Sequence, residues 1–104
     1  MIIVENIKKG TTLLIQTDND AVYEFVKSGT KYGFTVVNGR EIKTEIAIAM
    51  STKRLHRGKP IYMVVKSDKR TIVTANIMSM KMILPNGDSI EVWEEAINEN
   101  FGSG

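Results

Sequence analysis

Short runs of β-favouring residues, separated at close intervals by turn residues, extend through most of this chain. The runs span Ile2 to Ile7, Thr11 to Thr17, Ala21 to Val26, Gly33 to Val37, Arg40 to Met50, Ile61 to Val65, Arg70 to Ala75 with a continuation to Leu84, and Ile90 to Val92. Helical spacing of apolar residues appears only near the end, at Trp93, Ile97 and Phe101. The pattern is typical of an all-β fold, because strands alternate with period two and turns interrupt them.

The length of 104 residues fits one domain, which we place at residues 1–101. Gly102–Gly104 has the composition of a flexible tail or a cloning remnant. The hydrophobic fraction of 42% is enough for a core. We therefore expect a strongly bent antiparallel barrel or sandwich of the SH3 or Sm type, with about seven or eight strands and a short C-terminal helix or tail.

Two Asn-Gly pairs predict hairpins. Asn38-Gly39 predicts a type I′ turn with its partner strand beginning at Arg40, and Asn86-Gly87 predicts a second hairpin. As an alternative to that second hairpin, Asp88 and Glu91 have the spacing of a capping box for a helix that begins at Ser89.

The apolar pattern changes phase near Asn76. Val73, Ala75 and Ile77 share one face, and the stripe of Met78, Met80 and Met82 then occupies the other face. A strand changes its buried side only through a bulge or bend, so we expect one near Asn76. The methionines can serve either as core residues or as an adaptable contact surface, and core packing is favoured because Ser79 and Lys81 alternate with them.

Basic residues concentrate in one part of the chain. Residues 51–70 hold seven of the 14 cations against the single acid Asp68, namely Lys53, Arg54, Arg57, Lys59, Lys66, Lys69 and Arg70. Five acids and no cation follow from residue 88 onward, at Asp88, Glu91, Glu94, Glu95 and Glu99. The two segments either neutralise each other on a solvated face, or the connection at 53–59 forms an anion site.

Catalytic patterns are absent from the sequence. The chain has no cysteine, which excludes disulfides, thiolate metal sites and cysteine nucleophiles, and agrees with a reducing compartment. His56 is the only histidine, and no residue beside it in the sequence is placed to orient its ring for catalysis. Asp18 and Asp20 fit a turn better than a calcium loop, which needs ligands over about twelve residues. We expect no enzyme activity, no cofactor and no metal.

The segment Lys31-Tyr32-Gly33-Phe34-Thr35-Val36 looks like a shortened relative of the aromatic single-strand-binding motif of cold-shock and RNA-recognition domains. That resemblance implies bases stacked on the rings of Tyr32 and Phe34. The motif's glycine after the leading lysine is missing here, and strand alternation places both rings on one face, where core packing is the simpler use.

A second resemblance rests on three motifs between residues 13 and 77. Leu14–Asn19 followed by Tyr23, then Val37-Asn38-Gly39, then Ile72–Ile77, resembles in order the strand motifs of a loose group of small all-β bacterial and phage proteins without a settled function. Asn38 replaces an expected glycine, and Ala75-Asn76 a commoner serine-proline. The resemblance implies a barrel and a bacterial or phage origin, and supplies no active site.

We expect a module that binds an anionic ligand. That ligand is a nucleotide, an oligonucleotide or nucleic acid. The predicted ligand-binding residues are Lys53, Arg54, His56, Arg57, Lys59, Lys69 and Arg70, with help from Lys66. The alternative is a protein-interaction or assembly role, such as a small phage inhibitor of a host factor or a virion component. A third hypothesis combines these in an anti-defense phage oligomer that sequesters a nucleotide immune signal.

The expected partners and location follow from the same features. Exposed sheet edges with few prolines favour a homo-oligomer. No run approaches 18 apolar residues, and Glu5 closes the apolar start of the chain. We therefore expect no membrane association and a cytoplasmic location, in a bacterium or a phage-infected host cell.

Overall fold

Antiparallel strands form nearly all of the regular structure. The computed structural model describes residues 1–39, 45–65, 71–73 and 75–92. Within these ranges the elements are β1 (Ile2–Ile3), the 3₁₀ turn η1 (Val4–Asn6), β2 (Thr12–Thr17), β3 (Val22–Lys27), β4 (Gly33–Asn38), β5 (Ile46–Met50), β6 (Arg54–Leu55), β7 (Tyr62–Val65), β8 (Thr71–Val73), β9 (Ile77–Ile83) and β10 (Ser89–Glu91). The all-β prediction is confirmed.

The strands form one large sheet and one small sheet. The eight-stranded sheet has the order β10-β9-β2-β3-β4-β5-β7-β8, and β1 pairs with β6 in the two-stranded sheet. In the described part of the chain β8 and β10 are the two ends of the large sheet and do not pair with each other. The bent antiparallel sheet of the predicted size is therefore present, but it stays open and does not close into a barrel.

Alternation along the strands builds one buried face. On β2, Leu13 and Ile15 are buried while Leu14 is partly exposed and Gln16 is exposed, as the sequence predicts. On β3 the buried positions include Phe25 and, unexpectedly, Lys27. One cluster of buried residues joins the inward side chains of β2, β3, β4, β5, β7 and β9, so the sheet curls around a shared core.

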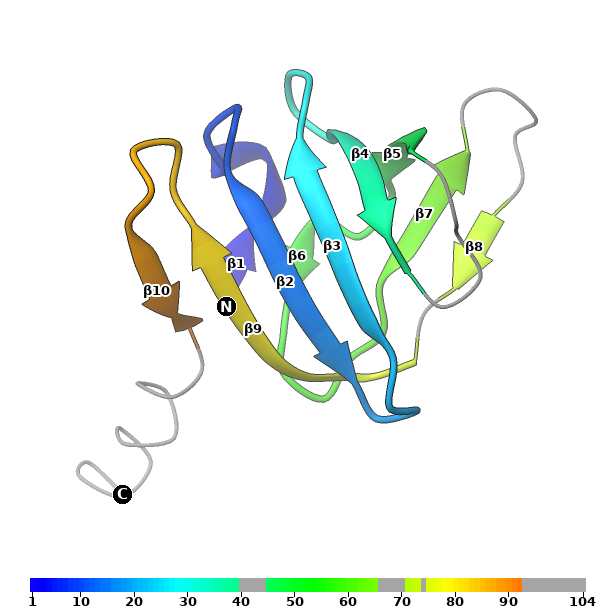
Figure 1. Ribbon diagram of the computed structural model, residues 1–104. Coiled ribbons are helices and arrows are strands. Elements are labelled where there is room, and N and C mark those ends of the chain that lie inside the picture. The colour runs from blue at the N-terminus through cyan, green and yellow to red at the C-terminus, as the bar shows by residue number, and fades with distance from the viewer. Residues whose placement is uncertain (40–44, 66–70, 74, 93–104) are drawn as a thin grey trace.

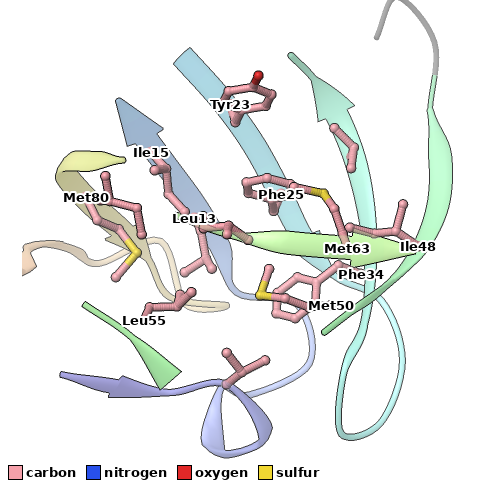
Figure 2. Close-up of a cluster of buried hydrophobic side chains, with 14 of the residues drawn as sticks. Leu13, Ile15, Tyr23, Phe25, Phe34, Ile48, Met50, Leu55, Met63 and Met80 are labelled. Carbon is pink, nitrogen blue, oxygen red and sulfur yellow. The ribbon is translucent and has the colours of Figure 1, made fainter. Parts of the chain in front are cut away.

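The small sheet covers part of the concave face of the large one. Figure 1 shows β1 and β6 behind β2 and β9. Leu55 of β6 is completely buried and belongs to the same core cluster as Leu13 and Met80. Figure 2 shows these three side chains grouped on one side of the core, with Met63 of β7 close to Phe25. The predicted first strand, Ile2 to Ile7, is shortened because the chain turns through η1 to bury Val4.

The two Asn-Gly pairs behave differently. Asn86-Gly87 lies in the β9–β10 turn as predicted; Gly87 has a φ of +94°, and its N–H donates to the Leu84 carbonyl oxygen at 2.9 Å. The prediction of a two-residue turn at Asn38-Gly39 is wrong. Such a turn would pair Val37 with Arg40, whereas Val36 pairs with Ile46. The strand β5 is Ile46–Met50. Residues 40–44 lie outside the described ranges.

A bulge occurs near the predicted position. Gln16 pairs with Ser79 but Thr17 pairs with Ile77, which leaves Met78 as the extra residue on β9. The bulge separates the methionine stripe, because Met80 is buried while Met78 is 48% exposed. Met82 is half-buried against the core. The core assignment of the methionines therefore holds for Met80, holds partly for Met82 and is wrong for Met78.

The aromatic motif on β4 serves the core. Phe34 is buried and Tyr32 packs against the core cluster. Because the ring of Phe34 has no exposed face, the base-stacking role implied for this pair is not available.

The helix proposed from Ser89 is wrong at its start, because Ser89–Glu91 pairs with β9 as β10. Glu91 lies opposite Lys81 in that pairing. The expected C-terminal helix or tail from Trp93, and the tail Gly102–Gly104, lie outside the described residues.

Candidate anion-binding site

The basic segment, residues 53–59, follows β5 and leads to β7, and β6 lies inside it. Its first half is fixed by the small sheet, in which Ile2 pairs with Leu55 and Ile3 with Arg54. The Val4 N–H donates to the Lys53 carbonyl oxygen at 2.9 Å. Together with the buried Leu55 side chain, these contacts give this half of the segment a fixed backbone. The cations are evident in the sequence, whereas the two-residue strand β6 is not among the predicted strands.

The second half is fixed against the start of β9. The Gly58 N–H donates to the Ile77 carbonyl oxygen at 2.8 Å, and the Ile77 N–H donates to the Lys59 carbonyl oxygen at 3.0 Å. The Lys59 N–H also donates to the His56 carbonyl oxygen at 3.2 Å. Gly58 permits this tight turn because its φ is +82°, a conformation that side chains disfavour. The basic segment is therefore held at both ends.

The polar side chains of the segment face solvent. Lys53, Arg54, His56, Arg57 and Lys59 are all exposed. Among the residues that the structure describes, none of them forms an ion pair or a side-chain hydrogen bond. Four cations thus lie within seven residues on a fixed backbone, with no acidic residue in the segment.

The described acidic residues near the C-terminus interact elsewhere. Asp88 accepts a hydrogen bond of 3.0 Å from the side-chain amide of Asn86, and its N–H donates to the Asn86 side-chain oxygen. A carboxylate oxygen of Glu91 lies 4.0 Å from Lys81 Nζ. Neither acid contributes to a neutralised face with the basic segment. Glu94, Glu95 and Glu99 lie outside the described residues.

Three further cations of the predicted site, Lys66, Lys69 and Arg70, lie outside the described residues. His56 lies on the turn with Gly58, where no described carboxylate contacts its ring. The structure therefore brings together Lys53, Arg54, His56, Arg57 and Lys59 in one connection.

The structure contains two features that the sequence pattern did not predict. The first is Lys27, which is 2% exposed and whose ammonium group donates to the carbonyl oxygens of Val4, at 3.0 Å, and Lys31. Burial lowers the pKa of Lys27, and the nearby charge of Glu5 partly opposes that shift. A sequence signal existed, because Lys27 continues the inward alternation of Tyr23 and Phe25.

The second missed feature is an apolar hollow between the N-terminal segment and the β9–β10 turn. Its walls come from residues far apart in the sequence, so no local motif marks it. Within the described ranges, no three histidine or acidic side chains gather as a metal site, and no helix has the length and apolarity to cross a membrane.

No protein-family model, curated protein or solved structure matches this chain.

Proposed function

We propose that this protein is a non-enzymatic binding module for an anionic ligand, a nucleotide, an oligonucleotide or nucleic acid, held by the basic segment. The observation that carries the proposal is the set of four exposed cations on a backbone fixed at both ends. Among the described residues, no acid forms an ion pair with them. A fixed backbone reduces the entropy that a bound phosphate would otherwise cost.

The two arginines are the main candidates for phosphate contact. Arginine offers a planar fork that forms two parallel hydrogen bonds to a phosphate, whereas lysine acts as a point charge. Arg54 lies on β6, and Arg57 lies on the turn with Gly58. Lys53 and Lys59 flank them and add sequence-independent attraction.

A matched pair of double variants tests this proposal. Arg54→Ala with Arg57→Ala removes two cations from the basic segment, and Lys9→Ala with Lys31→Ala removes two exposed cations elsewhere. Affinity is measured by fluorescence anisotropy with labelled oligo(dT) and by calorimetry with ATP. We expect the arginine variant to lose at least about tenfold in affinity and the lysine variant to lose less than about threefold.

Equal losses in the two variants would show diffuse attraction, and binding of neither probe by the parent protein would remove the proposal. Melting temperatures accompany both measurements. Since Arg54 and Arg57 are exposed, the arginine variant should melt within a few degrees of the parent.

A second candidate is a protein-interaction or assembly role. Its support is exposed apolar surface on both sides of β2. Val22 of β3 pairs with Gln16 of β2, and Met78 is the bulged residue of β9, which pairs with the other edge of β2. The β10 edge adds the exposed Ile90. A homo-oligomer would cover such surfaces. Light scattering that gives the 11.6 kDa monomer at all concentrations would remove the homo-oligomer and leave only contact with a different protein.

The combined hypothesis, a phage oligomer that sequesters a nucleotide immune signal, requires both properties together. It is supported only if the oligomer binds a nucleotide through the basic segment. Mass spectrometry of the purified protein for a retained nucleotide, in parallel with light scattering, tests this combination.

A further inference from the structure

The apolar hollow lies at one end of the large sheet. Its volume is about 660 Å³, within the range of about 300–1,000 Å³ that is usual for small-molecule sites. Its lining comes from residues 1–3, 6–8 and 11 and from residues 82 and 84–86. In Figure 1 these residues belong to the N-terminal segment around β1 and η1 and to the β9–β10 hairpin. We call this hollow the N-terminal pocket.

The chemistry of the lining is uneven. Aliphatic and thioether side chains predominate, with Ile3 on one wall and Met82 and Leu84 on the other. The polar side chains are two amides, Asn6 and Asn86, one hydroxyl, and the ammonium group of Lys8. No acidic residue belongs to the lining that the structure describes. Such a pocket favours an apolar molecule with one negatively charged end.

Thr11 supplies a second, independent observation. Thr11 is 1% exposed, and its side-chain oxygen Oγ1 has no hydrogen-bond partner. Its backbone is satisfied, because the Thr11 N–H donates to the Lys8 carbonyl oxygen at 3.0 Å and its own carbonyl accepts from the Lys27 N–H at 2.9 Å. Buried hydroxyls without a partner are few in native proteins and need a reason. Thr11 belongs to the lining of the N-terminal pocket, so a ligand group there provides the missing partner once the buried hydroxyl rotates toward it.

We propose that the N-terminal pocket binds a small amphipathic carboxylate, an acyl chain with one carboxylate head. The chain packs between Ile3 and Leu84, and the head pairs with the Lys8 ammonium group. The hydroxyl of Thr11 donates a hydrogen bond to the same ligand. Lys8 supplies a cation and the described lining holds no acidic side chain, so the charge of the lining favours an anionic head such as a carboxylate. The proposal does not depend on the anion site of the basic segment.

The probe is decanoate, with 1-decanol as the neutral-head comparison, both below their aggregation concentrations. Carbon-13 methyl spectra of the full chain locate the binding. We expect shifts in the methyl groups of Ile3, Ile7 and Leu84, and no shifts in those of Ile48 and Val65, which are core residues outside the lining. Shifts centred on the outward face, or no saturable shifts with either probe, would overturn the proposal.

Two variants test the wall and one surface variant is their control. Ile3 is 37% exposed, so Ile3→Glu places a carboxylate in the wall, and Pro85→Glu does so at an exposed lining position. Val22→Glu is the control, because Val22 is 52% exposed and outside the pocket. We expect both pocket variants to weaken decanoate at least about tenfold and the control to change it less than about twofold. Equal weakening in the control overturns the assignment.

Two further variants test the polar groups. Lys8→Ala should weaken decanoate about fivefold and leave 1-decanol unchanged, because only the charged head uses the cation. Thr11→Val keeps the side-chain shape but removes the orphan hydroxyl, so it should weaken decanoate while it raises the melting temperature. A Thr11→Val variant with a lower melting temperature and unchanged affinity would contradict the assigned role of the hydroxyl. A dimer that dissociates in Ile3→Glu would identify the pocket as a subunit interface instead.

Discussion

The ammonium group of Lys27 donates a hydrogen bond of 3.0 Å to the carbonyl oxygen of Val4 and so connects the large sheet to η1. The same group donates to the Lys31 carbonyl oxygen and lies 5.1 Å from the ring centroid of Phe34. The ammonium group thereby donates hydrogen bonds to carbonyl oxygens of two separate segments, η1 and the connection between β3 and β4. Val4 lies between the pocket residues Ile3 and Asn6 in the chain, and its N–H donates to the Lys53 carbonyl oxygen, so Lys27 supports both candidate sites indirectly.

Replacement of Lys27 by methionine should destabilise the fold. The variant keeps an apolar stem but leaves the carbonyl oxygens of Val4 and Lys31 without this donor, which costs about 1–3 kcal/mol in the free energy of unfolding. Urea denaturation measures the change. Lys9→Met is the control, because Lys9 is exposed and should change stability by less than about 0.5 kcal/mol. A Lys27→Met variant as stable as the parent would show that the buried ammonium contributes nothing net.

Stability should also depend on pH through Lys27. Burial lowers the pKa of Lys27 below its ordinary value of 10.5, so the unfolded chain binds more protons than the folded one between the two pKa values. The free energy of unfolding should therefore rise with pH across that alkaline interval and become level above about 10.5. Urea titrations at several pH values measure this rise. It should be missing from Lys27→Met, and an identical profile in the two proteins would contradict the depressed pKa.

The β9–β10 turn depends on Gly87. Its φ of +94° disfavours any side chain, while a Cβ atom there would meet no neighbour within 4 Å. Gly87→Val should therefore cost about 1–3 kcal/mol through backbone strain alone, and Gly87→Asn should cost less because asparagine tolerates positive φ better. Thermal melts of the two variants give the order. If the Gly87→Val and Gly87→Asn variants have the same melting temperature, backbone strain does not explain the need for glycine at this position.

The strands that follow a simple alternation could be predicted from the sequence. Leu13 and Ile15 on β2 and Phe25 on β3 show the expected period of two, and the change of phase near Asn76 marked the bulge at Met78 within two residues. Local patterns identify such elements because one strand's buried face is encoded within that strand.

Features that depend on distant pairing were not predictable. The Asn38-Gly39 pair has the local chemistry of a tight turn, but the pairing of Val36 with Ile46 uses a different register. β6 is too short to show a period, and it exists because β1 pairs with it. For the same reason, the cations of the basic segment are evident in the sequence but their fixed backbone is not. The N-terminal pocket is not evident either, because its walls meet only in the folded chain.

The salt dependence of oligonucleotide binding tests the central proposal most directly. Each phosphate contact to a single strand contributes about −0.7 to the slope of log K against log salt concentration. For oligo(dT) we predict a negative slope in the parent protein and a slope that is shallower by about 1.4 in the Arg54→Ala, Arg57→Ala variant, one contact being lost per arginine. The Lys9→Ala, Lys31→Ala variant should keep the slope of the parent. An unchanged slope in the arginine variant would contradict phosphate binding by the basic segment.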